Sequence, residues 1–270
     1  MTTNYVHGYR GRENQRLQDQ AETLLDLLHR DTRYAAGSAV LEAGCGVGAQ
    51  TLALARNSPQ AQITSIDRSS ASIAQARQRT DAAGLANVEF READILALPF
   101  APQSFDHVFV CFVLEHLPAA PLALERLIDV LRPGGSLTVI EGDHGSTLFH
   151  PESTAARASI DCLVQLQRCA GGDALIGRRL YPLLARAGLE NIRVEPRVAY
   201  ADAGRPAWVD GFTNKTFIAM VEGVRDDAVQ ARLIDADRFD AGVRDLRRTA
   251  DADGTFCYTF FKGTGTKKRP

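Results

Sequence analysis

Short apolar runs alternate with amphipathic segments over the first half of the chain. Five runs have the composition of buried strands: 38–44, 61–67, 87–94, 105–113 and 136–143. Three segments between them have helical spacing: 49–57, 69–84 and 121–135. In the last of these, Pro133 and the glycines after it are expected to stop the helix. Alternating strands and helices predict a parallel sheet with right-handed crossovers.

The second half of the chain has a different pattern. From Ser146 to about Arg168 it is helical with no strand between, and helix, turn and strand resume over 177–201. Residues 204–250 indicate a mostly helical insertion, and 254–265 an aromatic-rich strand. No internal repeat or low-complexity linker interrupts the chain, which predicts one domain over 1–270 with helical additions at 144–175 and 202–252.

Composition and charge favour a soluble, cytoplasmic protein. The chain has 270 residues, 45% of them hydrophobic, and a net charge of −2, so it lacks the basic surface of a nucleic-acid-binding protein. No apolar run approaches the roughly 18 residues that span a bilayer, and the start lacks the apolar core of a signal peptide. The five cysteines have no zinc-like spacing and are expected to be reduced and mostly buried. They are Cys45, Cys111, Cys162, Cys169 and Cys257.

Three glycines follow the first predicted strand, in "VLEAGCGVGAQT" at residues 40–51. Glycines in such a place let backbone approach a ligand closely. Gly44, Gly46 and Ala49 satisfy the loose dinucleotide fingerprint, so the stretch alone fits either a nicotinamide or flavin dinucleotide or S-adenosylmethionine.

Three acids near strand ends distinguish these ligands. Glu42 stands two residues before the first glycine, where a carboxylate can attract an ammonium group. Asp67 ends the second strand, where it can accept from both ribose hydroxyls, and Asp94 ends the third, where it can accept from an adenine amino group. A ligand with an amino acid at one end and adenosine at the other accounts for all three acids, whereas NAD has no need of Glu42.

Five motifs then appear in order over residues 36–143: "VLEAGCGVG", "ITSIDRS", "VEFREADILALPF", "SFDHVFVCFVLEHLP" and "VLRPGGSLTVIEGD". With these motifs the chain resembles the class I S-adenosylmethionine-dependent methyltransferases. Its "VLEHL" and "LRPGG" runs are most similar to those of ubiquinone-type and secondary-metabolite members. The resemblance implies a Rossmann-like α/β fold with a seven-stranded, mostly parallel sheet whose last strand is antiparallel, the final two strands coming from "IRVEPRVAYA" and "TFCYTFFKG".

The resemblance also implies positions along the cofactor. Glu42, Gly44 and Gly46 are expected along the methionine part, Asp67 at the ribose, and Asp94 and Ile95 at the adenine. The fourth strand ends at Cys111 and Phe112, which would offer a carbonyl to the ammonium group. Cys45 and Arg68 complete the predicted cofactor set from this region.

Residues 1–30 are predicted to form a lid, because in this family such a segment often folds over the cofactor. An aromatic face near a sulfonium is favourable, which makes Tyr5 and Tyr9 catalytic candidates, with His7 on the acceptor side. Arg16 and Gln20 are candidates to hold the methionine carboxylate. The alternative is a helix start with no ligand contact.

The acceptor is expected beyond the fifth strand, in the polar stretch 141–153. Glu141, Asp143, His144 and His150 are candidates to orient an acceptor, and His144 is also a candidate base. Their spacing fits no zinc site, so we expect no metal. Trp208 in the helical insertion would wall the pocket. His116 in "VLEHLP" is a further catalytic candidate, with a structural role as the alternative.

These observations predict an S-adenosylmethionine-dependent methyltransferase of a small heterocyclic or aromatic metabolite, releasing S-adenosylhomocysteine. It would act by in-line transfer to nitrogen, oxygen or carbon, as a monomer or homodimer without nucleic-acid or membrane partners. The alternative within the class is a C-methyltransferase of a quinone or lipid precursor. Alternatives from other classes are a nicotinamide-dependent reductase and a non-catalytic cofactor-binding regulator.

Overall fold

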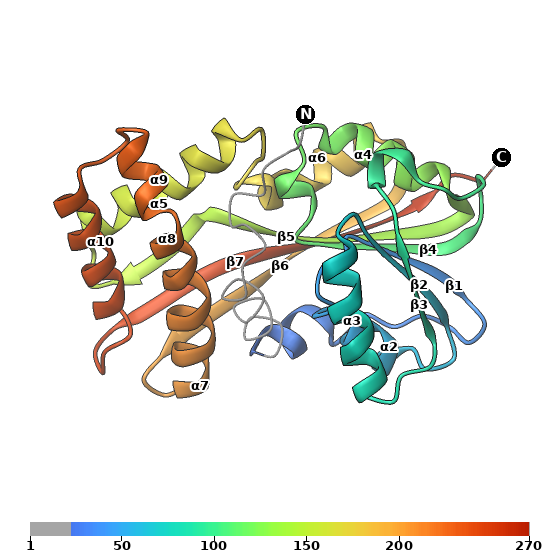
Figure 1. The fold of residues 1–270 in the computed structure, drawn as a ribbon, viewed down its shortest axis with the longest axis horizontal. Coiled ribbons are helices and arrows are strands. Elements are labelled where there is room, and N and C mark those ends of the chain that lie inside the picture. The colour runs from blue at the N-terminus through green and yellow to red at the C-terminus, as the bar shows by residue number, and fades with distance from the viewer. Residues whose placement is uncertain (1–22, 270) are drawn as a thin grey trace. The chain divides into compact units, whose positions relative to one another are not determined.

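The computed structural model describes residues 23–269, and over the first half its strands and helices alternate as predicted (Figure 1). The strands are β1 (Ala39–Ala43), β2 (Gln62–Asp67), β3 (Val88–Glu92), β4 (Phe105–Cys111) and β5 (Leu131–His150). The helices are α2 (Thr51–Asn57), α3 (Ser70–Ala82), α4 (Ala120–Asp129) and the single-turn η1 (Ile95–Ala97) and η2 (Leu114–His116). Helix α3 begins where the sequence predicts, because the hydroxyl of Ser69 accepts from the Ser72 amide.

The later elements complete a seven-stranded sheet. Their strands are β6 (Leu189–Asp202) and β7 (Thr255–Lys267), and the strand order is β3-β2-β1-β4-β5-β7-β6. Parallel pairing joins β3 to β2, β2 to β1, β1 to β4 and β4 to β5. The sheet is mostly parallel with antiparallel last strands, which confirms the predicted Rossmann-like class.

The chain forms two compact units. We call the first the glycine-loop unit; it comprises Leu28–Glu141, Ile176–Pro196 and Phe261–Pro270. The second, which we call the aromatic unit, comprises Gly142–Leu175, Arg197–Phe260 and the described part of Met1–Leu27. The predicted end of the cofactor-binding core, residue 143, lies two residues beyond the first of these boundaries.

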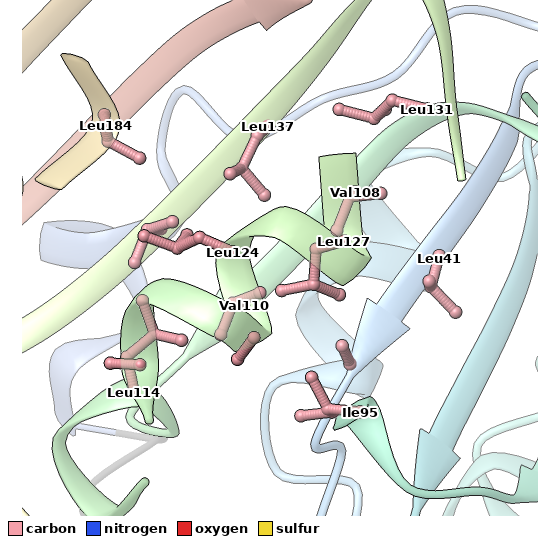
Figure 2. Close-up of a cluster of buried hydrophobic side chains, with 14 of the residues drawn as sticks. Leu41, Ile95, Val108, Val110, Leu114, Leu124, Leu127, Leu131, Leu137 and Leu184 are labelled. Atoms are coloured by element: carbon pink, nitrogen blue, oxygen red, sulfur yellow. The ribbon is translucent and has the colours of Figure 1, made fainter. Parts of the chain in front are cut away.

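The core of the glycine-loop unit packs α4 and α6 (Leu180–Arg186), which follows η3 (Ile176–Arg179), with strands β1, β4 and β5. Figure 2 shows this cluster, with Leu124 and Leu127 of α4 among side chains of β4 and β5. Both leucines are fully buried, whereas Leu122 on the same helix is 37% exposed. Helix α4 is therefore attached to the sheet mainly through Leu124 and Leu127.

The aromatic unit is built from helices and the outer parts of β5, β6 and β7. Its helices are α5 (Thr154–Cys169), α7 (Pro206–Trp208), η4 (Val209–Ile218), α8 (Ala219–Gly223), α9 (Arg225–Gln230) and α10 (Ala236–Arg248), which confirms the predicted helical insertion. Helices α5 and α10 pack together. They approach closely at Gly242, where an added Cβ would lie 2.3 Å from the carbonyl oxygen of Ala155.

Two predicted boundaries are wrong. The helix expected over 121–135 ends at Asp129, and β5 begins at Leu131, which pairs with Phe105 of β4 across an irregular register. The pairing starts before Pro133 because the carbonyl of Val130 already accepts from the Phe105 amide.

The start of the helix expected from Ser146 to about Arg168 is instead strand, because β5 continues to His150. Thr147 and Phe149 are buried while Leu148 between them is exposed, so the segment has the period of a strand. Helix α5 begins only after Ser153, whose hydroxyl caps it by accepting from the Ala156 amide.

All five cysteines carry free thiols. Cys45, Cys111 and Cys162 are buried, whereas Cys257 is half-buried and Cys169 is exposed. Within residues 23–269, no helix is long and apolar enough to cross a membrane.

The two leucines of α4 give a matched test of this core. Leu127→Ala is expected to lower the free energy of unfolding by about 2–5 kcal/mol, because it removes a fully buried side chain and leaves a cavity. Leu122→Ala, on the same helix, is expected to cost less than about 1 kcal/mol. Urea unfolding measures both, and equal losses would contradict the packing described.

Candidate functional site

The glycine loop after β1 has a backbone that only glycine adopts readily. Gly44, Gly46 and Gly48 have φ angles of +79°, +51° and +80°. A Cβ on Gly44 would lie 2.5 Å from Cγ2 of Val113, and one on Gly48 would lie 2.8 Å from Cβ of Ala76 on α3. A Cβ on Gly46 would meet no atom of residues 23–269 within 4 Å. The loop is therefore tightly packed on both sides of Gly46 and open at Gly46 itself.

Asp67 holds this loop from the end of β2. Its Oδ2 accepts from the Gly46 amide at 2.9 Å, and its Oδ1 accepts from the Ser69 amide at 2.9 Å. Each oxygen of an ionised carboxylate can accept more than one hydrogen bond, so Asp67 retains acceptor capacity for a ligand. Asp67, which is expected at the ribose, thus also orders the glycine loop, which is expected at the methionine part.

Glu42 is buried beneath the same loop. Its Oε2 accepts from the hydroxyls of Thr51, the first residue of α2, and Ser65 of β2, both at 2.6 Å. Burial raises the pKa of Glu42 to about 7, the two hydroxyl donors oppose this rise, and the nearby charge of Asp67 adds to it. The carboxyl group therefore ties β1, β2 and α2 together and changes protonation near neutral pH. Neither hydroxyl partner was predicted from the sequence.

Asp94 lies at the end of β3, as predicted, and is exposed. Its Oδ1 accepts from the Leu96 amide at 2.8 Å, so it caps η1, while Ile95 beside it is buried. Arg68, next to Asp67, is exposed. These positions leave Asp94 accessible to a ligand while its capping bond fixes the side chain.

The turn after β4 is held by the following strand. Phe112 has a φ of +57°, and its amide donates to the carbonyl of Ile140 at 2.9 Å. Oε1 of Glu141 accepts from the amides of Val113 at 3.1 Å and Leu114 at 2.8 Å. This turn contains the Cys111 and Phe112 positions expected near the ammonium group.

Three buried carboxyl groups, those of Glu42, Glu115 and Glu141, surround the end of β4. Burial is the main cause that raises the pKa of the Cys111 thiol well above its usual value, and the neighbouring carboxyl groups add to this rise, so the cysteine is suited to packing. His116 lies with its Nε2 3.6 Å from Glu115 Oε1. Among the described residues, no group of three or more acids, histidines and cysteines is placed to hold a metal ion.

The acceptor candidates lie on β5 and in the aromatic unit. His144 is buried, and its Nδ1 lies 2.7 Å from the hydroxyl oxygen of Tyr258 on β7. Its ring meets the ring of Phe217 edge-on at 6.2 Å. Asp143 is buried beside it and accepts from the Gly145 amide at 3.0 Å. The structure therefore pairs His144 with a tyrosine.

The remaining acceptor candidates lie in different places. His150 is exposed at the end of β5, where it was predicted to lie on a loop, and Trp208 is half-buried on α7. Tyr5, His7, Tyr9, Arg16 and Gln20 fall outside the described residues, so the lid stays a prediction.

Tyr258 is the residue that sequence reasoning missed. Its hydroxyl fits against Gly142, where an added Cβ would lie 2.3 Å from the hydroxyl oxygen. The available signal was the alternation of "TFCYTFF", which predicts that Phe256, Tyr258 and Phe260 share one buried face. It does not indicate which residue on another strand meets that face.

A sequence profile of the family described as "Methyltransferase domain" matches residues 35–188. The 27-O-demethylrifamycin SV methyltransferase of Amycolatopsis mediterranei (strain S699) is 28% identical over 229 residues, covering 84% of this chain and 78% of that protein. The 2-phytyl-1,4-naphtoquinone methyltransferase of Thermosynechococcus vestitus is 34% identical over 112 residues, covering 41% of this chain and 49% of that protein, so the chain spans about half its length.

A solved structure has the same fold. It is the phosphoethanolamine N-methyltransferase 2 of Haemonchus contortus in complex with S-adenosyl-L-methionine, with a TM-score of 0.56 and 18% sequence identity. The match covers 93% of this chain and 53% of that one.

Two glycines with similar backbone angles test the close contact in the glycine loop. Gly44→Ala is expected to weaken the binding of S-adenosylhomocysteine at least about tenfold, because the new methyl group must displace Val113. Gly37→Ala, at a φ of +78° with open space around it, should cost only about 1–2 kcal/mol of stability and leave binding unchanged. Calorimetry measures binding, and unchanged affinity in Gly44→Ala would contradict the tight loop.

Proposed function

We propose a substrate class and residue roles for this chain on the premise that it belongs to the S-adenosylmethionine-dependent methyltransferases. The acceptor that we propose is a hydroxyl group of a small aromatic metabolite. The observation that carries this proposal is the buried pair of His144 and Tyr258 among aromatic rings. A base is required when the acceptor must lose a proton, and histidine is the natural one near neutral pH.

The cofactor roles that we propose follow the strand ends. Asp67 would accept from the ribose hydroxyls and Asp94 from the adenine amino group, with Ile95 offering backbone. Arg68 would lie beside the ribose. The glycine loop, with Glu42 beneath it and Cys45 within it, would follow the methionine part.

These roles are supported by how the side chains are held. Asp67 and Asp94 each have a carboxylate oxygen fixed by a backbone amide. The open space at Gly46 lets a ligand approach the loop backbone.

On the acceptor side, we propose that Tyr258 fixes the ring of His144 through Nδ1, and that Nε2 takes the acceptor proton as the methyl group transfers. The cofactor supplies a methyl carbon activated by positive sulfur. The chain aligns the acceptor oxygen with that carbon and excludes water. Similarity to a 27-O-demethylrifamycin SV methyltransferase over 84% of this chain supports a hydroxyl oxygen as acceptor. His116, paired with Glu115, would serve a structural role.

Methylation at carbon is the second candidate. The naphthoquinone methyltransferase is 34% identical, although that match covers only 41% of this chain. A reduced naphthoquinone offers both hydroxyl and ring-carbon acceptors. The products formed from 1,4-naphthohydroquinone therefore distinguish O-methylation from C-methylation.

Asp67 tests the cofactor assignment. Asp67→Ala is expected to weaken the binding of S-adenosylhomocysteine by at least about tenfold, because each lost hydrogen bond to a charged group contributes about 1.5–3 kcal/mol. Asp81→Ala removes an exposed acid of α3 and serves as the matched control. Calorimetry measures both, and wild-type affinity in Asp67→Ala would rule out its role at the ribose.

Turnover tests the acceptor assignment. With 1,4-naphthohydroquinone, simpler aromatic diols and S-adenosylmethionine, the wild type is expected to form O-methyl products. His144→Gln should lower kcat by about 10²–10⁴-fold, and Tyr258→Phe by a smaller factor, with the binding of S-adenosylhomocysteine unchanged. Tyr200→Phe, at an exposed site on β6, is the control. Products of C-methylation would favour the second candidate, and the absence of turnover of every aromatic hydroxyl would contradict the proposed class.

A further inference from the structure

The turn after β4 has a backbone that needs support. Phe112 has a φ of +57°, which an aromatic L-residue adopts only when its surroundings impose it. Consecutive residues of β5 hold it: the Ile140 carbonyl accepts from Phe112, and Glu141 Oε1 accepts from Val113 and Leu114. Glu141 is the one side chain in this set, and it holds two successive amides with a single oxygen.

This turn is in contact with the glycine loop. The Val113 side chain occupies the space that a side chain at position 44 would need, 2.5 Å from where a Cβ would stand. A shift of Val113 would therefore alter the packing that fixes Gly44. The support that Glu141 gives to the turn therefore extends to the glycine loop, and the inference below rests on the proposed function, which places the cofactor along this loop.

The second oxygen of Glu141 is in a different situation. Oε2 is fully buried and has no hydrogen-bond partner among residues 23–269. The ionisable groups that surround the end of β4 from the packed elements are Glu115 and His116 on η2, Cys111 on β4, Glu42 on β1 and Lys262 on β7. Lys262 donates to Asp31 and Thr32, and no described cation forms an ion pair with Glu141. Burial, followed by the negative charge of Glu115, raises the pKa of Glu141 well above its usual range, although the backbone amides of Leu114, Val113 and Glu115 oppose this rise.

We propose that Glu141 is a positioning residue for the cofactor that acts as the neutral acid, with its carbonyl oxygen Oε1 holding the amides of Val113 and Leu114 and its hydroxyl oxygen Oε2 buried. An ionised carboxylate would place an uncompensated charge in this site, beside a second carboxyl group. The role needs an acceptor at Oε1 but no charge. A glutamine therefore retains it, and an apolar side chain of similar size does not.

Calorimetric titration with S-adenosylhomocysteine tests the positioning role without an acceptor substrate. Glu141→Met leaves two turn amides unbonded and is expected to weaken binding about tenfold or more. Glu141→Gln keeps an oxygen at the same place and is expected to restore affinity to within about threefold of the wild type. Glu125→Gln, on the exposed side of α4, controls for the loss of an acid elsewhere in the unit.

The pH dependence of thermal unfolding tests the neutral form. Because folding raises the pKa of Glu141, its contribution to stability is fully present below the unfolded value of about 4.3 and is lost as the pH rises toward the folded value. Glutamine does not titrate, so Tm of Glu141→Gln minus Tm of the wild type is expected to increase from pH 5 to pH 8. The same difference is measured for Glu125→Gln as the control for the loss of an exposed acid of α4.

Three results would overturn the proposal. If Glu141→Met binds S-adenosylhomocysteine like the wild type, the turn does not depend on this side chain. If Glu141→Gln binds S-adenosylhomocysteine about tenfold or more weakly than the wild type, the charge is required. A Tm difference that does not increase with pH means that the carboxyl group is ionised in the folded protein. The last two measurements use only the glutamine variant and the wild type, so they remain decisive if Glu141→Met does not fold.

Discussion

Where β1 and β4 end, the chain turns away from the sheet, and the amides that leave the strand ladder still need hydrogen-bond acceptors. Carboxyl groups on neighbouring strands supply them. Asp67 of β2 accepts from the Gly46 amide of the loop after β1, and Glu141 of β5 accepts from Val113 and Leu114 after β4. Because parallel strands all end at the same edge, one strand's side chain can bond the next strand's turn. The shape of the edge at which we propose that the cofactor binds depends on this arrangement.

A carboxyl group used in this way has two functions that ordinary mutagenesis removes together. Asp67 both orders the glycine loop and is the proposed acceptor for the ribose, so its loss changes the loop as well as the ligand contact. Protonation of the carboxyl group can separate its bond to a backbone amide from its contact with a ligand. A neutral acid still offers its carbonyl oxygen to a backbone amide, whereas binding an ammonium group or two hydroxyls favours the ionised form. Burial, which raises the pKa of both Glu42 and Glu141, therefore indicates a structural role for these two acids.

The sequence predicted the glycine loop and the acids at the strand ends because hydrophobic runs mark where strands stop. It did not predict the length of β5, since the alternation from His144 to His150 is carried partly by buried polar residues such as Thr147. The sequence also did not predict the hydrogen-bond partner of His144. Tyr258 lies 114 residues away along the chain, and no local pattern indicates which positions of β5 and β7 meet. Glu141 was expected at the acceptor, whereas the structure shows it bonded to backbone amides. Long-range register determines such contacts.

The space that Gly142 leaves for the Tyr258 hydroxyl links the identities of two residues far apart in the chain. Any side chain at 142 would need the volume that the phenol oxygen occupies, so an alanine there is compatible only with a smaller residue at 258. Related sequences should therefore exchange these two positions together, and a relative with a larger residue at 142 would have lost the tyrosine that contacts the histidine. A glycine at 142 together with a tyrosine at 258 would therefore mark relatives that retain this histidine environment.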